Sequence, residues 1–139
     1  MKDCSILIGS TYNISRVMTN EVYLAFLVCS GDTNPLHYND EYARTLGYSG
    51  KLMHGALLNA MISGLVGTAL PVRDTMCLMQ KVNYRKPFFL NETVDLTATV
   101  DSIQEAGIKD KWVIMLKLKF QVNSNTIANG MAEVLIGCE

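Results

Sequence analysis

An aspartate and a histidine lie close together in the segment S-G-D-T-N-P-L-H, as Asp32 and His37. Histidine exchanges protons near neutral pH, and a partly desolvated aspartate can do the same. Pro35 fixes one backbone torsion and restricts Asn34 before it, so the loop can hold both side chains towards one point. The tetrapeptide D-T-N-P alone is more typical of an Asx turn before a helix. Together with the residues described next, the segment predicts an acid/base pair.

A long apolar segment, residues 52–70, begins with a second polar group, His54 and Gly55. If this segment is a helix, the free backbone N–H groups and the dipole at its start can stabilise negative charge on an oxygen atom. Small or polar residues then recur at four-residue spacing, as Gly55, Asn59, Ser63 and Gly67. The stripe favours close packing at Gly67, whereas the amide of Asn59 and the hydroxyl of Ser63 need partners from a loop, water or a ligand.

The periodicity and the turn residues predict the elements that must position these groups. We expect a strand over residues 12–17, a helix over 20–29 and a short helix that ends before residue 47. The segment 52–70 is expected to be a buried helix. Four β-rich stretches come last, over residues 76–84, 94–103, 112–122 and 127–136. One long apolar helix and a late run of antiparallel strands predict an α+β domain, in which a curved sheet covers the helix.

Composition favours one domain without metal or disulfide staples. With 139 residues, of which 49% are hydrophobic, residues 1–139 can form a single core, and no linker or repeat divides them. A net charge of −1 and the lack of basic runs argue against nucleic acid as a partner. The four cysteines form no C-x-x-C pair, which favours buried free thiols over a disulfide framework or a zinc site.

The location expected from the sequence is the cytoplasm. Free thiols fit a reducing compartment, and the apolar patch near the N-terminus is too short for the core of a signal peptide. The segment 52–70 is almost long enough to span a membrane, but His54, Asn59 and Ser63 interrupt it. We therefore expect no membrane insertion.

Three stretches of the chain closely resemble the MaoC-like (R)-specific enoyl-CoA hydratases and dehydratases. They are F-L-V-C-S-G-D-T-N-P-L-H-Y-N-D-E-Y-A at residues 26–43, G-K-L-M-H-G-A-L at 50–57 and M-I-S-G-L-V-G at 61–67. The resemblance implies a single hot-dog domain, in which an antiparallel sheet wraps a long central helix, and a homodimer whose sheets join edge to edge. Exposed sheet edges also favour self-association, because they are unpaired unless covered.

The same resemblance implies a reaction and a role for each residue. Asp32 and His37 would activate one water and add it to a trans-2-enoyl thioester, which gives an (R)-3-hydroxyacyl thioester; the reverse reaction is dehydration. Gly55 would donate its backbone N–H to the thioester oxygen. The acid/base pair and the backbone N–H would need no metal or redox cofactor. Coenzyme A or an acyl carrier protein would enter as part of the substrate. The supporting residues would be Asn34 on the loop, Ser63 in the active-site hydrogen-bond set, and His54.

Three other functions remain as alternatives. An acyl-carrier-protein-linked dehydratase of fatty-acid or polyketide assembly would use the same residues, so the sequence barely separates it from a CoA hydratase. A hot-dog thioesterase commonly carries a carboxylate on its central helix, and residues 54–70 contain no Asp or Glu. A non-catalytic acyl-thioester-binding module has no need of both Asp32 and His37.

Two features bear on the substrate. Lys81, Arg85 and Lys86 can meet the phosphates of coenzyme A or an acidic carrier protein, but solvated charges at a strand end are the better interpretation. Ala56 stands where relatives often carry a larger residue, which leaves the acyl chain length open.

Overall fold

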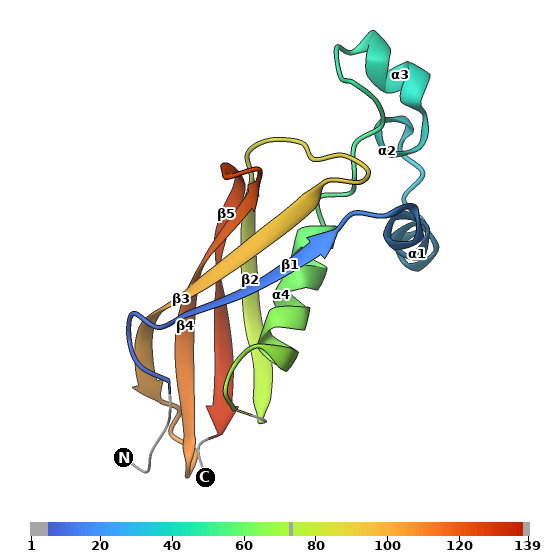
Figure 1. Ribbon diagram of the computed structural model, residues 1–139. Helices are drawn as coiled ribbons and strands as arrows, with labels where there is room; N and C mark the ends of the chain where they lie inside the picture. Colours follow the sequence, from blue (N-terminus) through green and yellow to red (C-terminus); the bar gives the residue numbers. More distant parts are fainter. Residues whose placement is uncertain (1–5, 73, 138–139) are drawn as a thin grey trace.

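The computed structural model describes residues 6–72 and 74–137 and confirms the predicted α+β architecture (Figure 1). Each predicted strand is present within three residues of its expected ends. In chain order the elements are β1 (Thr11–Val17), α1 (Asn20–Ser30), α2 (Pro35–Tyr38), α3 (Asp40–Thr45), α4 (Leu57–Thr68), β2 (Thr75–Tyr84), β3 (Thr93–Glu105), β4 (Lys111–Val122) and β5 (Asn125–Gly137).

The strands form one antiparallel sheet in the order β1-β3-β4-β5-β2. The helix α4 lies against one face of this sheet and contacts both β1 and β2, which are its two edge strands (Figure 1). A flat sheet cannot bring both edges to one helix, so the sheet curves round α4. On β4, Leu118 and Phe120 are buried while Lys119 between them is exposed, which confirms the predicted alternation.

Local hydrogen bonds set the limits of the short helices. The hydroxyl of Thr19 caps α1 by accepting from the Val22 N–H at 3.2 Å, and Gly31 ends this helix in the left-handed region, with φ of 65°. The turn α2 was predicted only as a loop. It is helical because Asn34 caps it, with Oδ1 accepting from the Leu36 N–H at 3.1 Å, and because proline is favoured at a first helical position.

The predicted central helix is present, but it is buried on one face only, and it is shorter than the segment 52–70. It begins at Leu57, and a turn precedes it in which the Leu57 N–H donates to the carbonyl of His54 at 3.1 Å. Before that turn the chain is extended, because Leu52 forms an isolated β-bridge with Phe89. His54 and Gly55 therefore stand at the approach to the helix rather than in it.

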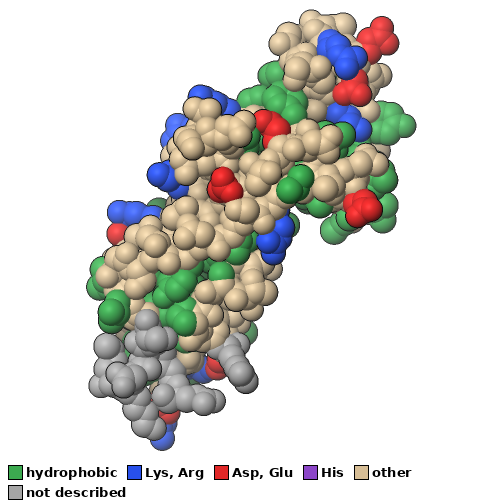
Figure 2. Space-filling view, viewed as in Figure 1, with side chains coloured by type: hydrophobic (Ala, Val, Ile, Leu, Met, Phe, Trp, Pro, Cys, Tyr) green, Lys and Arg blue, Asp and Glu red, His purple; other side chains and the backbone are tan. Residues whose placement is uncertain are grey.

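The region α1–α3 projects beyond one end of the sheet (Figure 1). Within these three helices only Tyr23 and Ala43 are buried, while Leu24, Val28 and Tyr38 are exposed. Figure 2 shows apolar side chains at the surface of this end, beside acidic and basic ones. Most of the buried apolar side chains lie instead in the core between the sheet and α4.

Two smaller predictions have mixed outcomes. Cys29 is exposed at the end of α1, so the prediction of a buried thiol is wrong there; Cys77 is half-buried, and Cys4 and Cys138 lie outside the described residues. In the part of the chain that the structure describes, no helix is both long and apolar enough to cross a membrane.

Candidate active site

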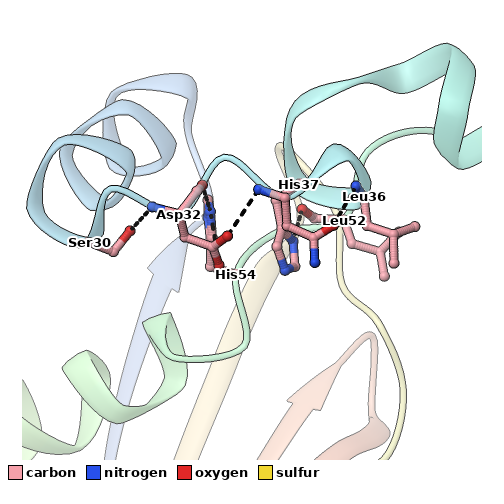
Figure 3. Close-up of polar contacts among 7 residues, drawn as sticks. Ser30, Asp32, Leu36, His37, Leu52 and His54 are labelled. Carbon is pink, nitrogen blue, oxygen red and sulfur yellow. Dashed lines mark hydrogen bonds and ion pairs between the residues drawn. The ribbon is translucent and has the colours of Figure 1, made fainter.

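Asp32 follows α1 directly and makes the Asx turn that its tetrapeptide predicts. Its Oδ1 accepts from the Asn34 N–H at 3.0 Å, and its own N–H donates to Oγ of Ser30 at 3.1 Å (Figure 3). The turn occupies one carboxylate oxygen only. The other, Oδ2, lies 3.9 Å from Nε2 of His54, and 43% of the side chain is exposed, so this oxygen is open to water or a ligand.

His37 lies on the helical turn α2. Its Nδ1 is 2.9 Å from the carbonyl oxygen of Leu52, and because a carbonyl only accepts, Nδ1 carries the proton. In the neutral ring the lone pair is then on Nε2, which can accept a proton. A second bond, from the Leu52 N–H to the carbonyl of Leu36 at 2.9 Å, ties the same two segments together. The ring is therefore held with a defined tautomer.

His54 joins the two predicted catalytic residues. Its ring is only 1% exposed and stacks on the ring of His37, with the centroids 4.4 Å apart and the planes at 28°. Its Nε2 donates to the backbone carbonyl of Asp32 at 3.1 Å, as Figure 3 shows. Phe26 and Tyr23 lie against the same ring, with centroids 4.8 and 5.7 Å away. The buried Nδ1 has no hydrogen-bond partner among the described residues.

Gly55 comes next and presents an unused donor. The N–H groups of Leu57 and Leu58 donate to the carbonyls of His54 and Gly55, at 3.1 and 2.9 Å. Within residues 6–72 and 74–137, the N–H groups of Gly55 and Ala56 donate to no acceptor. Free N–H groups beside the start of α4 lie where the helix dipole favours negative charge.

The stripe along α4 has two parts with different surroundings. The amide of Asn59 is paired on both sides: Nδ2 donates to Oε1 of Gln80 at 3.1 Å, and Oδ1 accepts from the Tyr84 hydroxyl at 2.6 Å. Ser63 and Gly67 are exposed. The close packing expected at Gly67 is wrong within this chain, since a Cβ there would meet no atom within 4 Å. Ser63 lies on the same helix as Asn59, but its hydroxyl makes no hydrogen bond to the described residues.

Sequence reasoning missed Tyr84. Its ring lies against Gly55, where an added Cβ would be 3.2 Å from Cε1 of the tyrosine. Partial burial raises the pKa of Tyr84 above its ordinary value, so the phenol stays a hydrogen-bond donor throughout the neutral range. In the sequence, Tyr84 is one aromatic residue near the end of a strand, and no spacing connects it with a residue 29 positions earlier.

The buried Tyr23 also has a raised pKa. The main cause is burial, followed by the charges of Tyr38 and Asp40. The ammonium of Lys51 lies 3.9 Å from the centre of this ring. The ring of Tyr23 therefore contacts both the ring of His54 and the ammonium of Lys51. These two contacts connect α1 to the segment that leads into α4.

The geometry has the parts of an acid/base site beside an oxyanion site. A carboxylate oxygen and an imidazole nitrogen can exchange protons, and a free N–H next to them can stabilise charge on a carbonyl oxygen. The fold that carries them, a helix wrapped by one curved antiparallel sheet, is the hot-dog fold.

The chain belongs to the family of MaoC-like domains, whose model matches residues 7–119. It is 26% identical over 128 residues to an (R)-specific enoyl-CoA hydratase of Rhodospirillum rubrum, covering 92% of this chain and 86% of the relative. It is also 26% identical over 120 residues to a mitochondrial 3-hydroxyacyl-[acyl-carrier-protein] dehydratase of Arabidopsis thaliana, covering 86% of this chain and 70% of the relative.

The fold agrees with that of a solved relative. The structure of the (R)-hydratase from A. caviae involved in PHA biosynthesis superposes with a TM-score of 0.83 at 26% identity, covering 95% of this chain and 98% of that one. The hot-dog fold implied by the sequence resemblance is thus confirmed.

Proposed function

We propose that this protein is a hydro-lyase that adds water to trans-2-enoyl thioesters with (R) specificity, and that catalyses the reverse dehydration of (R)-3-hydroxyacyl thioesters. One observation carries the proposal: Asp32 and His37 both contact His54, and the next residue, Gly55, has a free backbone N–H. Membership of the MaoC-like family and relatives named as hydratases support it.

The proposed reaction uses these groups together. The free oxygen of Asp32 and Nε2 of His37 hold one water molecule and take a proton from it. The hydroxide adds to C3 of the substrate, and the electron pair of the double bond moves towards the thioester oxygen, where the N–H of Gly55 donates. Asp32 and His37 then return the proton to C2, so one water molecule is added in total. General acid/base catalysis contributes about 10² to 10⁴ in rate, and a single oxyanion donor about 10² to 10³.

The supporting residues act on this arrangement indirectly. Asn34 caps the helical turn that carries His37, and His54 donates to the backbone of Asp32. Ser63 remains a proposed member of the active-site hydrogen-bond set, because a hydroxyl exposed on α4 is free to bond to a substrate. None of these steps requires a metal or a redox cofactor.

The carrier of the acyl group is coenzyme A in our proposal. The alternative carrier is an acyl carrier protein, and the plant relative named as a carrier-protein dehydratase supports this alternative. Lys81, Arg85 and Lys86 are exposed, which suits either carrier. A thioesterase is disfavoured, because α4 has the sequence L-L-N-A-M-I-S-G-L-V-G-T and thus no carboxylate.

The working unit in our proposal is a homodimer of one-domain chains in the cytoplasm. In the sheet order β1-β3-β4-β5-β2, one side of β2 pairs with no described strand, and Met76 and Leu78 on it are 60% and 48% exposed. An apolar strand with a free edge is a surface that a second copy can cover by continuing the sheet.

The test is the hydration of crotonyl-CoA, followed by the loss of absorbance of its conjugated enoyl group. We expect the wild type to form (R)-3-hydroxybutyryl-CoA, as shown by chiral analysis, and Asp32→Asn and His37→Asn each to lower kcat by at least about 10². Both changes spare the local structure: an asparagine oxygen can still accept from the Asn34 N–H, and an asparagine amide can reach the Leu52 carbonyl.

Three outcomes contradict the proposal. A folded wild type that hydrates neither crotonyl-CoA nor longer enoyl-CoA or enoyl-carrier substrates is not a hydratase. Formation of the (S) product overturns the stereochemistry. Full activity of either variant removes that residue from the catalytic pair.

A further inference from the structure

Tyr84 spans one turn at the start of α4. Its ring lies against Gly55, with Cε1, Cδ1 and Cζ at 3.2, 3.3 and 3.4 Å from the position of an added Cβ. Its hydroxyl donates to Asn59, which is four residues further along the chain, at 2.6 Å. Gly55 lies in the turn before α4, and Asn59 lies in the first turn of the helix itself. The Tyr84 side chain therefore contacts both Gly55 and the helical turn that follows it; we call this contact the brace.

The brace is itself anchored. Nδ2 of Asn59 donates to Oε1 of Gln80 at 3.1 Å, and Gln80 precedes Tyr84 by four residues on the same strand. Two hydrogen bonds thus connect β2 to Asn59 in the first turn of α4, and one ring contact connects β2 to Gly55 before the helix. Tyrosine is ordinarily protonated in the neutral range, and partial burial raises the pKa of Tyr84 further, so the phenol stays a donor to Asn59 although the residue is 55% exposed.

The contact matters because of what Gly55 must do in the proposed reaction. An N–H stabilises an oxyanion only if it points at the position that the charged oxygen will occupy, and a displacement of about 1 Å can cost about a hundredfold in rate. The turn over residues 54–56 has no side-chain cap, since none is made by Ala56. The ring of Tyr84 fills the space beside Gly55 that a side chain would otherwise occupy.

We propose that Tyr84, held by Asn59, is a positioning residue that fixes the backbone N–H of Gly55 for the thioester oxygen. This inference rests on the hydratase function proposed above. It also gives a reason for glycine at position 55: even a methyl group there would be 3.2 Å from the tyrosine ring.

The kinetic test compares Tyr84→Leu, Tyr84→Phe and Asn59→Leu with the wild type, using crotonyl-CoA. Tyr84→Leu removes the ring, and we expect kcat to fall by about 10- to 100-fold while KM changes by less than about threefold. Tyr84→Phe keeps the ring and loses only the hydrogen bond, so the loss should be several-fold smaller. The double variant Tyr84→Phe with Asn59→Leu should resemble Asn59→Leu alone, because Asn59→Leu already breaks the bond that Tyr84→Phe removes, together with the bond to Gln80.

A second cycle tests the contact with Gly55 directly. Gly55→Ala should lower kcat in the wild type, because the methyl group displaces the ring or the turn. In the Tyr84→Leu background the same change should cost several-fold less. Asn83→Ala is the matched control, because Asn83 adjoins Tyr84 on β2 and is bonded to Asn129 instead; its kcat should equal that of the wild type.

A spectroscopic measurement separates positioning from a general loss of structure. The chain has 10 glycines, so ¹⁵N-glycine labelling gives a simple amide spectrum in which Gly55→Ala identifies the Gly55 signal. We expect (R)-3-hydroxybutyryl-CoA to shift that signal in the wild type and to shift it less in Tyr84→Leu at saturation. Light scattering of each variant checks that the oligomeric state is unchanged.

The outcomes distinguish this inference from the function on which it rests. A wild type inactive on every enoyl thioester overturns the proposed function. An active wild type whose Tyr84→Leu variant keeps kcat, or loses only in KM, overturns the positioning role alone. Additive effects of Tyr84→Phe and Asn59→Leu overturn the part assigned to Asn59.

Discussion

The core formed by the sheet and α4 and the region α1–α3 are stabilised in different ways. In the core, large apolar side chains such as Leu65, Leu96 and Phe120 are fully buried. In α1–α3 only Tyr23 and Ala43 are buried, and side chains bonded to nearby backbone groups define the structure instead. The caps by Thr19, Asn34 and Asn39 are of this kind.

The difference shows that the core gives stability and that the region α1–α3 orients polar atoms. Burial of apolar surface is strong but non-directional, so it gives a stable frame without fixing any one polar atom. Hydrogen bonds from caps and turns are weak but directional, so they aim the carboxylate and the imidazole. The two regions meet at His54, whose ring is buried against α1 and whose backbone leads into α4. Changes in each region should therefore affect different properties.

The largest effect is a loss of stability, which we expect from Phe120→Ala in the core. Phe120 is fully buried on β4, between Leu96 of β3 and Ala128 of β5. Removing a buried phenylalanine side chain typically costs about 3 to 5 kcal/mol of stability. Urea unfolding should show this loss, while kcat for crotonyl-CoA, measured where the variant is folded, stays within about threefold of the wild type.

Lys119→Ala is the control for this change, since Lys119 is the exposed neighbour on the same strand and should leave the unfolding midpoint almost unaltered. A Phe120→Ala variant with normal stability but a low kcat would mean that the core acts on the site directly, and the division between the two regions would fail.

The sequence predicted the frame better than the site, for a physical reason. Alternation such as Leu118, Lys119 and Phe120 records which face of a strand is buried, and burial is what holds the sheet together. The sequence also indicated Asp32 and His37, because proline and two proton-transfer groups are local features. The start of α4 at Leu57 was missed because an apolar run shows burial but not where the helical turns begin.

The contacts that arrange the site could not be predicted in this way. Nothing local indicates that Nδ1 of His37 donates to the carbonyl of Leu52, or that Tyr84 lies against Gly55, because the partners are far apart in the sequence and meet only in the folded chain. The helical turn α2 is an instructive case: Asn34 and Pro35 are typical start signals, but four residues are too few to show helical periodicity.

An intermediate effect, a loss of kcat, is expected from substitutions of His54, where the two regions meet. Nε2 of His54 donates to the Asp32 carbonyl, whereas Nδ1 has no described partner. Glutamine can place an amide N–H near the position of Nε2, but the shorter asparagine reaches only the position of Nδ1. We expect His54→Asn to lower kcat by about 10- to 100-fold, and His54→Gln to keep several times more activity.

Steady-state kinetics on crotonyl-CoA and urea unfolding of the same two variants provide the measurement. Both substitutions remove the ring that stacks on His37, so their losses of stability should be similar. Equal activity of the two variants would show that the bond to Asp32 is unimportant and that the ring acts only by packing.

The smallest effect is expected from Asn34→Ala, which tests whether the directional bonds of the loop act locally. Asn34 caps α2 through the Leu36 N–H, and loss of such a cap costs about 0.5 to 2 kcal/mol. Because α2 projects from the core, this cost should appear as faster amide exchange over residues 36–38 and a several-fold lower kcat, with no shift in global unfolding. Asn34→Ser keeps a capping oxygen and should restore most of the activity. A shift of the global midpoint in Asn34→Ala would instead show that the loop carrying Asp32 and His37 unfolds together with the core, so that the orientation of His37 and the stability of the sheet could not be changed separately.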